Sequence, residues 1–169
     1  KQDPTNHYWQ GDYAGALTEQ AAESLAAGDI ATARLQAQAA LHILEPMLTR
    51  DPDERDTLLA TMTAKLLLAS VNNAPDVAQS LREQALQTMQ AVKIDRKDLR
   101  LLALQAEALL GLGRNGEARP LIKQLWSEGY RERGLVEMLQ RERIAYPANP
   151  AFQQRITETA RNSTSAVAQ

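Results

Sequence analysis

The sequence predicts an all-α protein, and three observations lead to that prediction. Strong helix formers, chiefly alanine, leucine, glutamine, glutamate and arginine, dominate the 169 residues. No stretch shows the alternation of apolar and polar residues that is typical of a strand. Turn-forming residues recur at short intervals and divide the chain into eight segments, each long enough for a helix.

Within each segment, apolar side chains recur at the spacing of one helical face. We therefore expect eight helices, at about residues 6–27, 29–48, 53–71, 75–92, 97–112, 115–127, 133–144 and 150–161.

Specific residues predict where several of these helices begin, bend or end. Gly28 ends the first helix, and Asp29 is placed to cap the second. Pro46 lies inside the second helix, where its missing amide predicts a bend or an early stop near Glu45. Pro75 is expected in the first turn of the fourth helix, where a missing amide costs nothing.

A repeat is visible in the turn sequences. Asp3-Pro4 recurs as Asp51-Pro52 after 48 residues, and Asp95-Arg96 follows after a further 44. Each interval holds two expected helices, which must be antiparallel to fit. Similarity at this period indicates a solenoid, in which helical pairs bury their apolar faces by stacking on one another.

The segment 97–127 resembles the tetratricopeptide repeat, although Gln105 stands where that family prefers leucine. The matching positions are Leu102, Ala106, Leu109, Gly113, Ala118, Ile122 and Leu125. The resemblance implies a right-handed α-α superhelix of about four helical pairs with long helices. The pairs are expected at about residues 6–50, 53–94, 97–127 and 131–161, in one domain over residues 1–161, followed by a disordered tail over 162–169.

Composition excludes several functions. The 19 basic and 21 acidic side chains are mixed along the chain, so we expect no nucleic-acid partner. The absence of cysteine excludes thiolate zinc sites, disulfides and cysteine nucleophiles. No stretch approaches the roughly 20 apolar residues that span a bilayer, so we expect no membrane insertion of this segment.

Catalytic and metal sites are not expected either. Residues 111–116 match G-x-G-x-x-G, but a dinucleotide site needs a strand before that loop, and here a helix is expected. We therefore interpret the match as a turn between helices. His7 and His42 lack a second histidine at helical metal-binding spacing. The sequence thus predicts a protein that is not an enzyme and needs no cofactor.

Both ends of the chain resemble the C-terminal repeat regions of bacterial signalling proteins. Asp3-Pro4-Thr5-Asn6 with Trp9, and Gly129-Tyr130-Arg131, carry this resemblance. It is nearest to the tetratricopeptide sensor region of membrane-anchored serine/threonine protein kinases, with winged-helix transcription regulators as a second possibility. The resemblance implies a non-catalytic sensor module that binds a protein, a peptide or a small ligand, as the C-terminal piece of a longer protein. A periplasmic location is then favoured over a cytoplasmic one. The alternative is a dimerisation or docking module without a diffusible ligand.

The resemblance also implies a concave groove lined by the first helix of each pair. By analogy with the third repeat, Arg100 and Glu107 face that groove, and Tyr13 and Lys65 are expected there from the neighbouring first helices. A peptide carboxylate would pair with Arg100 or Lys65. Tyr8, Trp9 and Tyr13 also form an aromatic cluster at the N-terminal edge, which predicts packing on an upstream repeat or homodimer formation.

Overall fold

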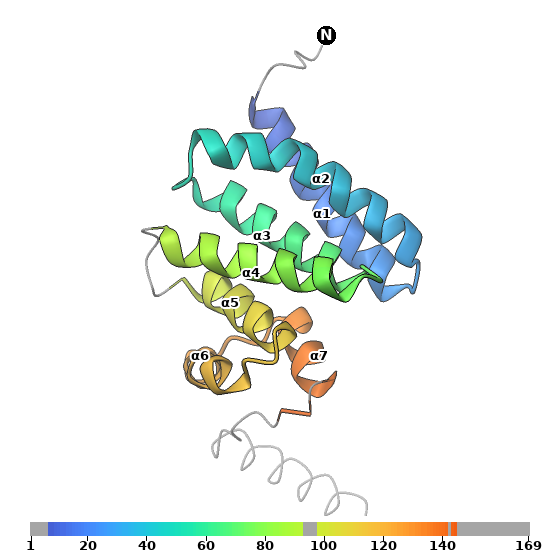
Figure 1. The fold of residues 1–169 in the computed structure, drawn as a ribbon. Coiled ribbons are helices and arrows are strands. Elements are labelled where there is room, and N and C mark those ends of the chain that lie inside the picture. Colours follow the sequence, from blue (N-terminus) through green and yellow to red (C-terminus); the bar gives the residue numbers. More distant parts are fainter. Residues whose placement is uncertain (1–6, 93–97, 142, 145–169) are drawn as a thin grey trace, which may run out of the picture. The chain divides into compact units, whose positions relative to one another are not determined.

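The computed structural model describes residues 7–92, 98–141, 143 and 144, and over these residues it contains seven α-helices and no strand (Figure 1). The prediction of an all-α protein is confirmed, and, apart from the early stop considered for the second helix, each described helix begins and ends within three residues of its expected position. The eighth predicted helix, the polar tail and the junctions at Asp3 and Asp95 lie outside the described residues. The helices are α1 (His7–Ala26), α2 (Ile30–Arg50), α3 (Arg55–Ser70), α4 (Pro75–Ala91), α5 (Leu99–Gly111), α6 (Asn115–Ser127) and α7 (Arg133–Arg141).

The turn between α1 and α2 is formed as the sequence predicts. Gly28 adopts a φ of 82°, a left-handed conformation that glycine reaches without steric cost. The amides of Gly28 and Asp29 then donate to the carbonyls of Leu25 and Ser24, at 3.0 and 2.9 Å, which closes α1. The carboxylate of Asp29 accepts from the amide of Thr32 at 3.0 Å and so caps α2.

Of the two outcomes predicted at Pro46, a bend or an early stop near Glu45, the early stop is excluded, because α2 continues past the proline. The helix continues to Arg50, and the amide of Asp51 still donates to the carbonyl of Met47 at 3.0 Å. Proline removes one hydrogen bond, but the residues on either side have packing partners: Leu44 is buried and Met47 is partly buried. Tertiary packing therefore outweighs the local cost of the proline.

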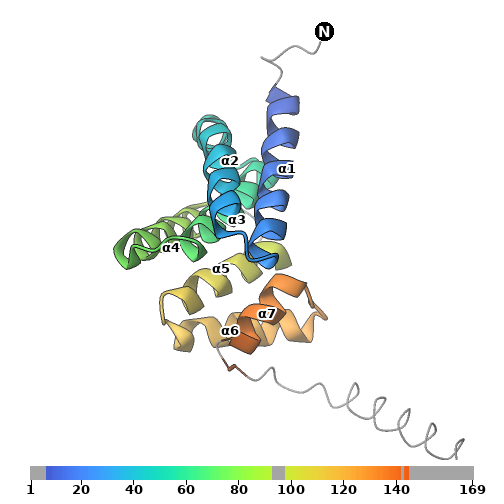
Figure 2. The ribbon, with the colours of Figure 1, turned by 90° about the vertical axis from the view of Figure 1, so that its right-hand side faces the viewer.

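The chain falls into two compact units, Lys1–Leu121 and Ile122–Gln169, divided within α6. In the first unit, each of the helices α1 to α4 contacts the next one along the chain. In addition, α1 contacts α3, and α3 contacts α5. Figures 1 and 2 show α3 between the α1–α2 pair and α4. Helix α3 thus touches all four of the other helices from α1 to α5.

The sequence of α3 explains this central position. Its apolar residues are spread around the helix rather than confined to one stripe, which is typical of a helix that is covered on several sides. The hydroxyl of Thr61, which is fully buried, donates to the carbonyl of Thr57 at 2.6 Å, so no polar group there lacks a partner. The buried residues of α3 are Thr57, Leu58, Leu59, Thr61, Met62, Ala64, Leu66, Leu68 and Ala69.

The second unit contains the end of α6 and the helix α7. Ile122, Leu125, Leu135 and Leu139 are buried. The guanidinium of Arg131 lies over the ring of Trp126, 3.1 Å from the ring centroid, which is the geometry of a cation–π contact.

An ion pair joins the first turn of α3 to the first turn of α5. The Nε of Arg55 lies 2.5 Å from the Oδ2 of Asp98. The Oδ1 of Asp98 accepts from the amides of Arg100 and Leu101, at 3.0 and 3.2 Å, and caps α5. Burial alone would raise the pKa of Asp98, but the hydrogen bonds from Arg55 and the two amides outweigh burial and lower it.

We expect Asp98→Ala to lower the free energy of unfolding by about 1 to 2 kcal/mol, because it removes both the cap and the ion pair. Asp98→Asn keeps a capping oxygen and should cost less. Because the pKa of Asp98 is lower in the folded chain, protonation favours unfolding. The wild type should therefore have a higher free energy of unfolding than Asp98→Asn at every pH above about 4, the pKa of this carboxyl in the unfolded chain. This difference in stability should disappear as the pH falls through the lower pKa of Asp98 in the folded chain. Chemical denaturation at several pH values measures this, and an advantage that persists in strong acid would contradict it.

Candidate functional site

A cleft of about 700 Å³ opens among α1, α2 and α3, at the end of the unit where α2 finishes and α3 begins. This volume is within the range of ligand pockets in proteins. The lining residues come from three stretches: Gly11, Asp12, Gly15, Ala16 and Glu19 of α1; Leu44, Met47, Arg50 and Asp51 at the end of α2; and Glu54, Asp56, Thr57 and Ala60 around the start of α3.

The apolar part of the cleft comes from Leu44 and Met47, and small residues on α1 keep it open. A side chain at Gly11 would place its Cβ 3.3 Å from the Cε of Met47, so the absence of a side chain lets Met47 approach the backbone of α1. A Cβ at Gly15 would meet nothing within 4 Å. Gly15 therefore borders open space, and a larger residue there would project into the cleft.

The rim of the cleft is acidic. Its lining includes five carboxylates, Asp12, Glu19, Asp51, Glu54 and Asp56, and one basic residue, Arg50. Asp56 pairs with Arg55, its Oδ1 lying 3.0 Å from the Nη1 of that residue. Within the part of the chain that the structure describes, Asp12, Glu19 and Asp51 have no basic side chain at ion-pair distance.

Glu54 is held in its ionised form by the start of α3. Its carboxylate accepts from the amides of Asp56 and Thr57, at 3.0 and 2.6 Å, and so caps the helix. Burial alone would raise the pKa of Glu54, but hydrogen bonds from Thr57 and Asp56, with the charge of Arg55, lower it below its usual value. This carboxylate therefore contributes a negative charge to the cleft at neutral pH.

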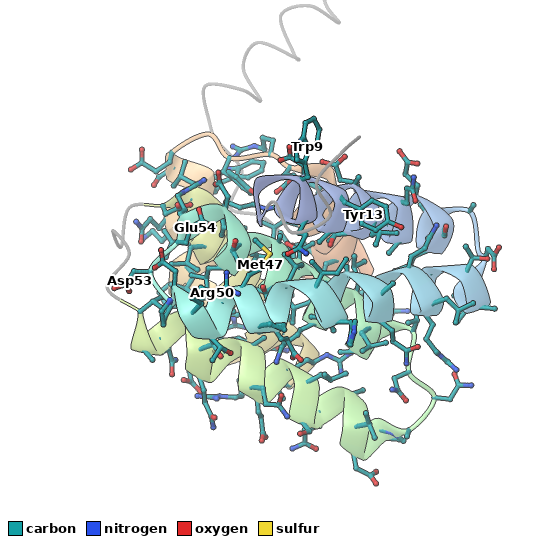
Figure 3. The ribbon with its side chains drawn as sticks, turned by 90° about the horizontal axis from the view of Figure 1, so that it is seen from above. Trp9, Tyr13, Met47, Arg50, Asp53 and Glu54 are labelled. Carbon is teal, nitrogen blue, oxygen red and sulfur yellow. The ribbon has the colours of Figure 1, made fainter. Side chains whose placement is uncertain are left out.

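An exposed aromatic strip borders the cleft on α1. Trp9 and Tyr13 are 55% and 61% exposed, which is high for large aromatic side chains. With Asp12 and Ala16, which line the cleft, they occupy neighbouring positions at helical spacing. Figure 3 shows both rings on α1, with Met47, Arg50 and Glu54 gathered where α2 ends and α3 begins. Neither ring lines the cleft itself; the two residues are neighbours along α1 of residues that do.

The four residues predicted to bind a ligand do not line this cleft, and the structure does not bring them together. Tyr13 lies on the strip just described, next in sequence to Asp12, which lines the cleft. Lys65, in the middle of α3, faces α2 and α4 instead. Its Nζ lies 2.9 Å from the Oε1 of Glu45 and 3.4 Å from the Oε1 of Gln84, and its side chain is only 12% exposed.

Arg100 and Glu107 lie on α5, about two helical turns apart on one face, and both are half-buried. The backbone amide of Arg100 belongs to the cap formed by Asp98. Gln105, the residue that departs from the repeat pattern, reaches the carbonyl of Met89 on α4 at 3.5 Å. A binding role for Tyr13, Lys65, Arg100 and Glu107 stays a prediction.

Sequence reasoning missed the cleft, although the sequence carries a signal for it. Small and acidic residues alternate on one face of the first helix: Gly11, Asp12, Gly15, Ala16 and Glu19. A face composed in this way neither fills a core nor carries the mixed charges of an ordinary solvated face.

The G-x-G-x-x-G match is a helix end, as the sequence context predicts. Gly113 has a φ of 72°, and its amide donates to the carbonyl of Leu110 at 2.9 Å. The amide of Arg114 donates to the carbonyl of Leu109 at 2.8 Å, which completes the closing motif of α5. The match therefore follows a helix and not a strand.

The described ranges contain neither a metal-binding cluster nor a membrane-spanning helix. No three side chains of the metal-binding types gather there into a site for a metal ion. No helix in those ranges is both long and apolar enough to cross a bilayer. In comparisons with protein-family models, curated proteins and solved structures, the chain matches none.

The contacts of Lys65 lead to a prediction about stability. Glu45→Gln leaves a largely buried ammonium without its counter-charge, and we expect the free energy of unfolding to fall by about 0.5 to 1 kcal/mol. Glu23→Gln, which changes an exposed glutamate of α1, is the matched control and should have little effect. Thermal unfolding of the two variants compares them, and an equal loss in both would show that the Lys65–Glu45 pair contributes nothing.

Proposed function

We propose that this chain is a non-catalytic binding module of the tetratricopeptide type, which holds a segment of a protein or peptide in the cleft of α1, α2 and α3. It would serve as the sensor or interaction domain of a larger bacterial signalling protein, such as a receptor serine/threonine kinase. The observation that carries the proposal is the cleft itself, a cavity of ligand-binding size with an apolar floor and a charged rim.

The helix contacts support a repeat arrangement. Contacts from α1 to α3 and from α3 to α5 link the first helices of successive pairs, as stacking of helical pairs requires. The positions that match the repeat pattern are also buried: Leu102, Ala106, Leu109, Ala118, Ile122 and Leu125.

Gly15 supports a binding role for the cleft. Glycine inside a helix costs about 0.5 to 1 kcal/mol relative to alanine. That cost is usually explained by a positive φ or by a close internal contact, and Gly15 has neither. A partner that approaches the backbone of α1 closely would explain the glycine.

A binding event at this position offers a simple means of signalling. A ligand in the cleft contacts α1, α2 and α3 at once, so it favours conformations in which the first helical pair stays docked on α3. A ligand shifts an equilibrium only by its difference in affinity for the two states. The attached domain would respond to the orientation of this pair.

The alternative is a dimerisation or docking module without a diffusible ligand, and the exposure of Trp9 and Tyr13 favours it. Sedimentation velocity at several concentrations separates the two functions. A chain that stays monomeric and binds a peptide contradicts the alternative, whereas a dimer that Trp9→Ala dissociates supports it.

The proposed function is tested by closing the cleft. The leucine side chain of Gly15→Leu should project into the open space of the cleft. The fold should stay intact, because leucine is a better helix former than glycine. Gly116→Leu, at another glycine with open space around it but outside the cleft, is the matched control. A displayed library of random peptides is selected on the wild-type chain, and the affinity of the enriched peptides is measured for both variants.

We expect enriched peptides to lose at least about tenfold in affinity for Gly15→Leu and to bind Gly116→Leu like the wild type. Peptides that bind both variants equally, with circular dichroism unchanged, would place binding outside the cleft. A selection without any enriched peptide would also contradict the proposal.

A further inference from the structure

We infer that the cleft of α1, α2 and α3 recognises a basic peptide segment, one in which lysine or arginine alternates with apolar side chains. This inference rests on the proposed function and adds the chemical class of the ligand. It starts from the charge distribution. The five carboxylates and one arginine of the lining give a formal charge of −4, whereas the whole chain carries −2. The remaining residues together therefore carry +2, and the negative charge is concentrated at the cleft.

Three of the five carboxylates of the cleft lack an internal counter-charge within the described part of the chain. Asp12, Glu19 and Asp51 have no counter-charge at ion-pair distance among the described residues, so they repel one another across a partly enclosed space. A cationic group in the cleft would relieve that repulsion, and an anionic group would increase it. Peptide carboxylates and phosphates are therefore disfavoured as ligands of this cleft.

The apolar surfaces indicate a peptide and not a small cation. Leu44 and Met47 offer a hydrophobic floor, and the flexible thioether of Met47 adapts to side chains of different shape. Beside the rim, the exposed rings of Trp9 and Tyr13 provide surface on which lysine or arginine binds by cation–π contact. A free polyamine would satisfy the carboxylates but would leave the floor without an apolar partner.

The test uses labelled octapeptides in which leucine alternates with lysine, glutamine or glutamate, together with spermine as a cation without apolar side chains. Binding to the full chain is measured by fluorescence anisotropy, and spermine is measured as a competitor. The variant Asp12→Asn with Glu19→Gln removes two charges from the cleft. Its matched control, Glu23→Gln with Glu128→Gln, removes two exposed charges elsewhere.

We expect the lysine peptide to bind about tenfold more tightly than the glutamine peptide, and the glutamate peptide not to bind measurably. The cleft double variant should weaken binding of the lysine peptide about three- to tenfold, and the control double variant by less than about twofold. Added salt should lower the affinity of the lysine peptide more than that of the glutamine peptide, because the carboxylates lie near solvent, where salt screens their charge.

Each result that contradicts the inference leads to a different conclusion. If the three peptides bind equally and Gly15→Leu abolishes all of them, the cleft binds peptides but the preference for positive charge is wrong. If the lysine peptide binds Gly15→Leu as tightly as the wild type, its binding is a general charge effect. The same conclusion follows if its affinity falls equally in the two double variants. If spermine displaces the peptide at equal concentration, the ligand is a simple cation. If the lysine peptide fails while library-selected peptides bind, this inference falls and the proposed function stands.

Discussion

The burial of α3 is the constraint on which the first unit depends. A helix with apolar residues on most of its circumference cannot exist alone in water, and α3 contacts each of α1, α2, α4 and α5. Helices α1, α2, α4 and α5 therefore have a common surface on which to pack. The contacts of α1 and of α5 with α3 follow from this central position.

Because other helices cover α3, the charged side chains of α3 need partners on those helices. Lys65 lies in the middle of α3, where its ammonium needs a partner, and it reaches Glu45 on α2 and Gln84 on α4. Arg55 lies at the first turn, closer to solvent, and pairs with the residue that caps α5. The two cations thus link α3 to three different helices. This role in holding helices together was not visible in the sequence, where Lys65 looked like a groove residue.

The helices were predictable from the sequence because their signals are local. Gly28, Asp29 and Gly113 determine turns through their own backbone conformation or their own side chains, and the structure forms those turns as expected. The sequence left two outcomes open at Pro46, because the effect of the proline depends on the packing of Leu44 and Met47, which lie close to it in sequence but pack against other helices. The cleft was missed for the same reason. It requires three helices to meet, and the angle between them is not a property of any one segment.

The acidic residues of the cleft have different origins, and the difference indicates which of them matter for binding. Glu54 caps α3, and Asp56 lies in its first turn, where the helix dipole favours a negative charge. Folding alone accounts for these two. Asp12 and Glu19 lie beyond the first turn of α1, without a cap to form and without an internal counter-charge among the described residues. Gly15 lies between them on the same face, at helical spacing, and has no internal reason to be glycine. No cap, ion pair or close internal contact among the described residues accounts for these three residues, and the proposed binding of a partner would explain them.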